Sequence, residues 1–211
     1  MPRALLLDFG GVVLRTPFEL IDGFLARRGL PSGLLPWRGP FDSDGDPLFA
    51  QVLEGSLKER EYWRTRNAEV EELIGNPGDY PALHELFEAS EEELIRPELR
   101  ALIDERLAAG HPVAILTNDL SHFHPQAWID RISVLHEVDH LIDLSHTDYL
   151  KPDPRAFEVA AETLGLPPSE ILFVDDQPVN LAGADQVGMP HVHFDPTDVA
   201  SSIAKIRARL D

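Results

Sequence analysis

Four short apolar runs constrain the fold of this chain more than any other feature of its sequence. They cover residues 4–7, 113–116, 171–174 and 191–194, and each run ends where polar residues begin. Runs of this kind are typical of strands that are buried on both faces of a parallel sheet. A further short strand is expected at residues 140–142.

Helical patterns occupy the segments between these runs. Residues 97–109, 154–164 and 179–187 carry apolar positions at helical spacing, and a glycine, a residue that commonly ends a helix, follows each segment directly or nearly so. Strands that alternate with helices predict an open α/β sheet with right-handed crossovers. We therefore expect a Rossmann-like three-layer α/β/α core with a parallel sheet.

Residues 16–96 interrupt this alternation. They contain no continuous β-branched run, and their apolar positions recur at helical spacing. Helices are expected at residues 18–28, 47–54, 57–73 and 81–95. The sequence thus predicts a small all-helical cap domain at 16–96, inserted into a core domain made of residues 1–15 and 97–211.

Composition excludes several kinds of function. The 211 residues include no cysteine, which removes disulfides, thiolate metal sites and cysteine nucleophiles. A net charge of −19 repels phosphate backbones and anionic lipids, so we expect no binding to nucleic acid or membranes. No apolar run approaches the roughly 18 residues of a membrane span, and the chain begins without a signal-peptide pattern, so we expect a cytoplasmic protein. No heptad pattern stands out, and a monomer or a homodimer is expected.

Polar side chains follow the ends of the predicted strands. In a parallel sheet the carboxyl ends of the strands form the edge where ligands bind, so these residues are expected to lie close together. They supply carboxylates, a hydroxyl, an amide and flexible glycines, and an amine precedes the helix at residues 154–164. In chain order they are Asp8, Gly10, Gly11, Thr117, Asn118, Lys151, Asp175 and Asp176.

The order of these residues resembles that of the haloacid dehalogenase-like hydrolases, in the branch with a helical cap inserted after the first motif. Residues 5–13 match the first motif with Asp8 as nucleophile, and Thr117-Asn118 match the second. Lys151 matches the third, and residues 173–176 match the fourth. The resemblance implies a phosphoric monoester hydrolase that acts on a small phosphorylated metabolite through an aspartyl-phosphate.

The resemblance also implies a role for each residue of the site. Mg²⁺ would be held by Asp8, the carbonyl oxygen of Gly10 and Asp176, with Asp175 as a further ligand or an orienting carboxylate. The phosphate would be bound by Thr117, Asn118, Lys151 and Gly11, with Thr117 and Lys151 also assisting catalysis. Lys151 would in addition keep Asp8 ionised.

Gly10 departs from the family pattern, because phosphatases of this family usually carry a second Asp there as general acid and base. One outcome is a phosphatase that uses water or a nearby group such as Asp119, or that prefers leaving groups needing little protonation. A second is a 2-haloacid dehalogenase, since halide leaves without a proton. A third is a regulatory protein that binds a phosphate ligand with weak or no turnover. The pair Asp175-Asp176 favours the phosphatase.

Two histidines, His122 and His124, follow the second predicted strand with one residue between them. A zinc site would need further paired ligands. The two histidines could approach the site, but the interpretation that we favour is that they are ordinary loop or helix-start histidines.

Overall fold

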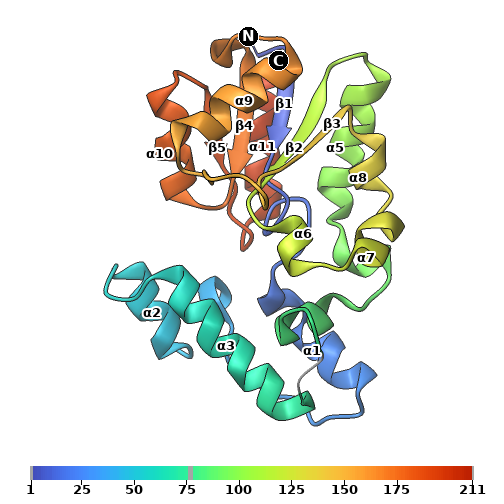
Figure 1. Ribbon diagram of the computed structural model, residues 1–211, viewed down its shortest axis with the longest axis vertical. Helices are drawn as coiled ribbons and strands as arrows, with labels where there is room; N and C mark the ends of the chain where they lie inside the picture. Colours follow the sequence, from blue (N-terminus) through green and yellow to red (C-terminus); the bar gives the residue numbers. More distant parts are fainter. Residues whose placement is uncertain (1, 76–77, 211) are drawn as a thin grey trace. The chain divides into compact units, whose positions relative to one another are not determined.

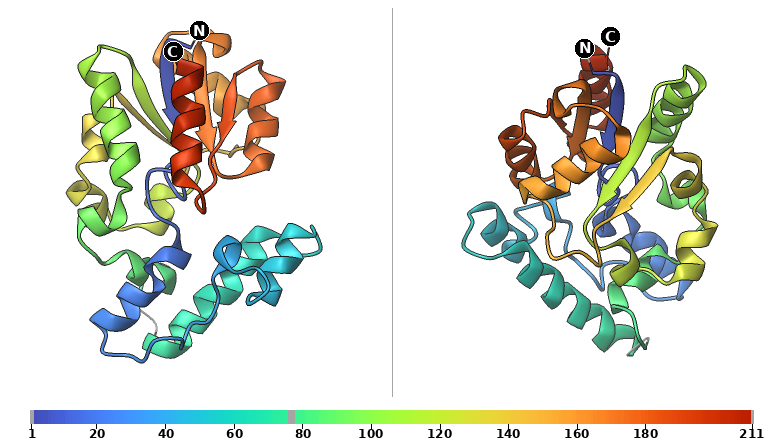
Figure 2. Two further views of the ribbon diagram at one scale, coloured as in Figure 1. Left: turned by 180° about the vertical axis from the view of Figure 1, so that it is seen from behind. Right: turned by 45° about the horizontal axis from the view of Figure 1, so that its top comes forward.

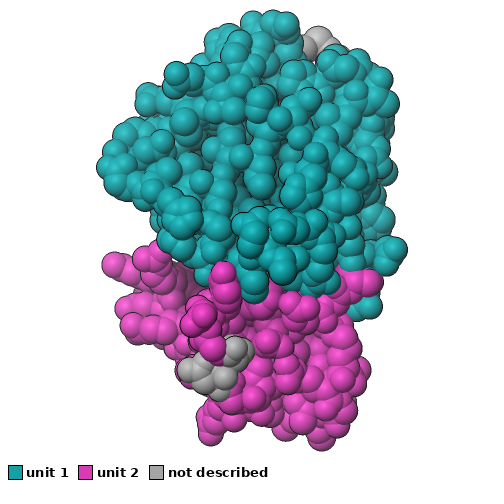
Figure 3. Space-filling view, turned by 45° about the vertical axis from the view of Figure 1, so that its right-hand side comes forward, with its two compact units in different colours: residues 1–15, 91–211 teal, residues 16–90 magenta. Residues whose placement is uncertain are grey.

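The computed structural model describes residues 2–75 and 78–210. It divides the chain into two compact units, which Figure 3 shows in different colours. The core unit comprises the chain up to Arg15 and from Glu91 onward, and the helical unit is Thr16–Ser90.

The core unit contains a five-stranded sheet in which every neighbouring pair is parallel, with the strand order β3-β2-β1-β4-β5 (Figure 1). The strands are β1 (Ala4–Leu7), β2 (Val113–Thr117), β3 (His140–Asp143), β4 (Ile171–Asp175) and β5 (His191–His193). All five lie where the apolar pattern predicts them. The central strands β1, β2 and β4 are buried along their whole length, which explains their uninterrupted apolar sequence.

Helices cover both faces of this sheet, which gives the expected α/β/α layers. One face packs against α9 (Pro154–Leu164) and α10 (Pro178–Gln186), where Phe157 and Leu181 join Leu6 and Phe173 in a single apolar cluster. The other face is covered by α5 (Pro97–Ala108) and α11 (Val199–Leu210), seen in green and red in the left view of Figure 2. The remaining short helices of the core unit are α4 (Glu91–Leu94), α6 (Leu120–Phe123), α7 (Gln126–Arg131), α8 (Val134–Glu137) and η3 (Pro168–Glu170).

Register and strand order locate the place where a ligand can bind. Leu7 of β1 lies opposite Val174 of β4, so Asp8 and Asp175 come next at the same level of the sheet edge. The chain fills one side of β1 with β2 and β3 and then crosses to the other side for β4 and β5. Ligands bind beyond the carboxyl ends of the strands at such a change of direction.

The helical unit consists of α1 (Pro17–Arg27), η1 (Gly39–Phe41), α2 (Pro47–Leu53), α3 (Glu59–Ile74) and η2 (Ala82–Phe87). Its interior is aromatic, because the ring of Phe18 contacts the rings of Trp37, Phe49, Tyr62 and Trp63. The aromatic rings pack mostly edge-to-face or tilted, the arrangements that aromatic pairs prefer.

A buried carboxylate ties these helices together. Asp46 accepts hydrogen bonds from the hydroxyl of Tyr62 at 2.7 Å, the guanidinium of Arg66 at 2.5 Å, and the backbone N–H groups of Phe49 and Gly39. These donors satisfy a charge that would otherwise be costly to bury.

Two sequence-based boundaries need correction. The expected helix at residues 81–95 is instead the 3₁₀ helix η2 followed by the separate helix α4. Residues 91–96 also belong to the core unit rather than to the cap. The reason is that Arg96 is buried and donates hydrogen bonds to Val13 and Gly11, while Ile95 forms a β-bridge with Leu14. Among the described residues, no helix is long and apolar enough to cross a membrane.

Candidate functional site

Asp8 is held at the carboxyl end of the central strand by its own backbone. Its N–H donates to the carbonyl of Val174 at 2.8 Å, which continues the ladder between β1 and β4. The side-chain Oδ1 accepts a hydrogen bond from the N–H of Phe9 at 2.7 Å and lies 2.7 Å from Nζ of Lys151. These contacts occupy Oδ1 and fix the orientation of the carboxylate, so that Oδ2 remains to react.

Lys151 is a buried cation between two carboxylates. Its Nζ lies 2.7 Å from Oδ1 of Asp8 and 2.7 Å from Oδ2 of Asp175. The side chain of Asn118 holds the backbone at this point, because its Oδ1 accepts from the N–H of Lys151 and its Nδ2 donates to the carbonyl. A residue from the end of β2 thereby positions the lysine that precedes α9.

Asp175 is fully buried and surrounded by donors. Besides Lys151, Nδ2 of Asn180 lies 3.1 and 3.0 Å from its two oxygens, and the N–H of Gln177 donates to Oδ1 at 2.8 Å. Asn180 is a site residue that the strand-end pattern could not reveal, because it is the third residue of α10 and does not directly follow a strand.

Asp176 lies against the loop that follows β1. A Cβ atom placed on Gly11 would come within 2.3 Å of Oδ2 of Asp176, and Gly11 has φ +83°. Glycine is needed at position 11 for two reasons. A side chain there would clash with Asp176, and any other residue would be strained at this positive φ. At Gly10, by contrast, an added Cβ meets no atom within 4 Å, and φ lies outside the left-handed region.

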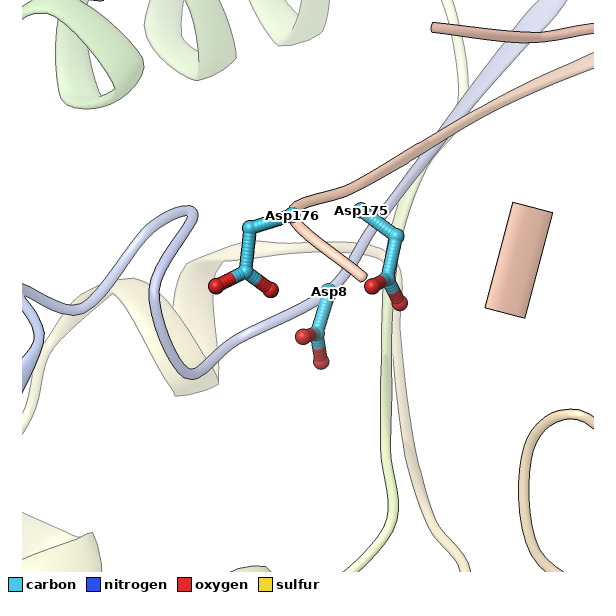
Figure 4. Close-up of side chains that lie close together, drawn as sticks. All are labelled: Asp8, Asp175 and Asp176. Atoms are coloured by element: carbon cyan, nitrogen blue, oxygen red, sulfur yellow. The ribbon is translucent and has the colours of Figure 1, made fainter. Parts of the chain in front are cut away.

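Three carboxylates converge at this point, as Figure 4 shows. One oxygen each of Asp8, Asp175 and Asp176 lies within 4.8 Å of the others. When all of these groups are ionised, the three carboxylates carry three negative charges beside the single positive charge of Lys151. An all-oxygen donor set with excess negative charge suits a hard divalent cation such as Mg²⁺.

Electrostatics within the cluster support the same conclusion. Burial, reinforced by Asp175 and opposed by Lys151, raises the pKa of Asp8 to about 7. Burial also disfavours the charge on Lys151, but Asp175 and Asp8 outweigh it and hold the pKa of the ammonium above its usual range. Lys151 therefore stays protonated, while Asp8 needs further positive charge nearby to be fully ionised at neutral pH.

The structure thus brings Asp8, Asn118, Lys151, Asp175, Asp176 and Gly11 into one cluster. Thr117 is buried at the end of β2, next to β1 at the same edge of the sheet, and Gly10 is exposed in the loop that follows Asp8. The roles of these residues remain predictions.

Comparison with known proteins shows the family. Residues 2–188 match the haloacid dehalogenase-like hydrolases. The chain belongs to this family.

Relatives of this hydrolase differ in the reactions for which they are named. It is 29% identical to ribulose-1,5-bisphosphate 5-phosphatase of Halopiger xanaduensis, over 66% of the chain and 59% of that protein. It is 28% identical to (S)-2-haloacid dehalogenase H-109 of Pseudomonas putida, over 56% of the chain and 52% of that protein. The matches cover between 18% and 59% of the first four curated relatives.

Solved structures share the fold of this hydrolase at low sequence identity. The Bacillus subtilis hydrolase YfnB, solved with magnesium, has a TM-score of 0.66 and 16% identity, with 100% of this chain and 99% of that chain covered. Fold and family are therefore established, and the reaction has to be argued from the site.

Proposed function

We propose that this hydrolase is a Mg²⁺-dependent phosphatase that removes phosphate from a small phosphorylated molecule through an aspartyl-phosphate on Asp8. The observation that carries the proposal is the convergence of Asp8, Asp175 and Asp176 beside Lys151. A dehalogenase needs no such carboxylate cluster, because its leaving halide requires no divalent cation.

Asp8, Asp176 and the carbonyl oxygen of Gly10 would hold the ion. Asp175, whose oxygens already accept from Lys151, Asn180 and Gln177, would mainly orient its neighbours. Bound Mg²⁺ would neutralise charge on the phosphoryl oxygens and on the attacking carboxylate.

In the first step, Oδ2 of Asp8 attacks phosphorus and the bond to the leaving oxygen breaks. Lys151 and Phe9 keep Oδ1 in place, so that Oδ2 faces the phosphoryl group. Thr117 and the backbone of Asn118 would donate hydrogen bonds to the phosphoryl oxygens. The expected phosphate-binding role of Gly11 needs correction, because its N–H already donates to the carbonyl of Leu14 at 2.9 Å. The leaving alkoxide takes a proton from water, because Gly10 offers no side chain.

In the second step, water attacks the phosphorus of the aspartyl-phosphate. The bond between phosphorus and Oδ2 of Asp8 breaks, which releases inorganic phosphate and regenerates the carboxylate. Dividing the reaction in this way replaces one difficult displacement with two easier ones.

The proposal is tested by phosphate release from p-nitrophenyl phosphate and from a panel of phosphorylated metabolites, with Mg²⁺ or with EDTA. We expect turnover only with Mg²⁺, and a loss of more than about 1,000-fold in Asp8→Asn, since this change removes the nucleophile. Asp104→Asn, which changes an exposed carboxylate on α5, is the matched control and should leave turnover unchanged.

Two results would support other functions. Halide release from 2-haloacids in the presence of EDTA would identify a dehalogenase, which the match to the Pseudomonas putida enzyme keeps as a second candidate. Tight binding of phosphate or vanadate without turnover of any phosphate ester would instead identify a regulatory protein that binds a phosphate ligand.

A further inference from the structure

Two exposed histidines lie side by side at the sheet edge, although 24 positions separate them in the sequence. His122 belongs to α6, which follows β2, and His146 lies in the loop that follows β3. Their ring centroids are 4.9 Å apart and the ring planes meet at 89°. The chemistry proposed for Asp8 uses neither residue.

This spacing fits two imidazoles that bind one metal ion. With bonds of about 2.0–2.1 Å from zinc to nitrogen, each ring centroid lies about 3.2 Å from the ion, and a tetrahedral angle places the two centroids about 5 Å apart. The observed centroid separation of 4.9 Å matches this value.

A hydrogen-bond chain orients one of the two rings. The hydroxyl of Ser121 donates to Oδ2 of Asp143 at 2.6 Å, so its oxygen can accept from Nε2–H of His146 at 3.3 Å. Asp143 also accepts from the backbone N–H of Ser121 and from Ser145. Outer partners of this kind fix the tautomer of a histidine ligand and leave its other nitrogen, here Nδ1, to bind the metal.

The carboxylate at the end of this chain is charged. Burial alone would raise the pKa of Asp143, but the hydrogen bonds from Ser121 and Ser145 outweigh it and hold the pKa below its usual range. No residue in the described part of the chain hydrogen-bonds to Nδ1 of His146 or to either ring nitrogen of His122. Three ring nitrogens on these two exposed side chains therefore have no hydrogen-bond partner among the described residues.

We propose that His122 and His146 form a binding site for a divalent transition-metal ion of the Zn²⁺, Ni²⁺ or Cu²⁺ class. Imidazole nitrogen suits these ions, whereas Mg²⁺ prefers the oxygen ligands of the Asp8 cluster. Water molecules complete the coordination. This site is chemically distinct from the proposed Mg²⁺ site, and both belong to the core unit.

Isothermal titration calorimetry with ZnCl₂, NiCl₂ and CuCl₂ on the full chain in excess Mg²⁺ tests the proposal. We expect one binding site. His122→Ala and His146→Ala should each weaken binding by roughly 10- to 100-fold or more, because loss of a residue that only orients a metal ligand already lowers metal affinity by this factor. His111→Ala, which alters an exposed histidine at the opposite end of β2, is the control and should bind as the unaltered protein does.

Electron paramagnetic resonance of the Cu²⁺-loaded protein provides a second readout. We expect hyperfine coupling to two imidazole nitrogens, reduced to one in either single variant. The proposal is overturned if the unaltered protein binds these ions no more tightly than the double variant His122→Ala/His146→Ala. It is also overturned if neither single variant weakens binding. Phosphatase activity takes no part in these measurements, so the test is independent of the proposed function.

Discussion

A methyl group on Gly11 would lie 2.3 Å from Oδ2 of Asp176, closer than non-bonded atoms can approach. The carboxylate expected to hold Mg²⁺ therefore packs directly against the backbone of the loop that follows Asp8. A side chain at position 11 can therefore be accommodated only if the carboxylate of Asp176 moves away.

Gly11→Ala should consequently displace Asp176 and weaken Mg²⁺ binding. We expect the Mg²⁺ concentration for half-maximal turnover to rise by about tenfold or more, comparable to the loss of a partner that orients a metal ligand. Gly10→Ala is the matched control, because a Cβ at Gly10 meets no atom within 4 Å. An equal shift in both variants would show that Asp176 does not depend on the absence of a side chain at Gly11.

The open space at Gly10 also allows the missing proton donor to be introduced. Gly10→Asp should raise kcat/KM for alkyl phosphates by about tenfold or more, because a positioned general acid typically contributes about 10²- to 10⁴-fold. Aryl phosphates should respond less, since their leaving groups are stable as anions. Gly10→Asn provides a side chain of the same size that cannot transfer a proton. If alkyl and aryl substrates respond equally, or if Asn acts like Asp, then proton transfer is not what this protein lacks.

Lys151 should be as important for stability as for chemistry. Lys151→Met leaves Asp8 and Asp175 buried beside each other without a cation, and removing one partner of a buried ion pair costs about 3–5 kcal/mol. Urea unfolding in EDTA, followed by circular dichroism, measures this loss. Lys205→Met alters an exposed lysine of α11 and should cost little.

Two further measurements identify the cause of that loss. Adding Asp175→Asn to Lys151→Met should recover part of the free energy of unfolding, because it removes one uncompensated charge. Excess Mg²⁺ should also stabilise Lys151→Met, since a ligand of the folded state raises stability by mass action. If Lys151→Met in EDTA is as stable as Lys205→Met, charge compensation by Lys151 does not stabilise the fold.

Sequence patterns predicted the core well because its strands are buried on both faces. The apolar runs at residues 4–7, 113–116 and 171–174 correspond to β1, β2 and β4 within one residue. The same patterns failed at residues 81–95, where buried residues at helical spacing form a 3₁₀ helix and a separate short α-helix. Periodicity does not distinguish these, because both kinds of helix place every third or fourth residue on one face.

Strand ends predicted which residues gather at the site but not how they contact one another. Parallel pairing of β1 with β4 predicts that Asp8 and Asp175 lie close together. The two hydrogen bonds between the side chain of Asn118 and the backbone of Lys151 depend instead on the path of the loop before α9. The pairing of His122 with His146 likewise depends on the placement of α6 after β2 and on the loop that follows β3. His124, one residue beyond Phe123, is instead buried and stacked on Trp128.

Acid should weaken the helical unit through Asp46. Burial alone would raise the pKa of Asp46, but hydrogen bonds from Tyr62 and Phe49 and the charge of Arg66 outweigh it and lower the pKa. The unfolded chain, with a carboxyl pKa of about 3.9, then binds the proton more readily, so this stabilisation is present at neutral pH and is lost as the pH falls below about 4.

Asp46→Asn should therefore be less stable than the unaltered protein at pH 7, with a difference that shrinks towards pH 3. Urea unfolding followed by tryptophan fluorescence measures this difference. Asp44→Asn, an exposed neighbour, is the control and should show almost none. A difference between Asp46→Asn and the unaltered protein that stays constant from pH 7 to pH 3 would mean that the charge of Asp46 does not stabilise the fold.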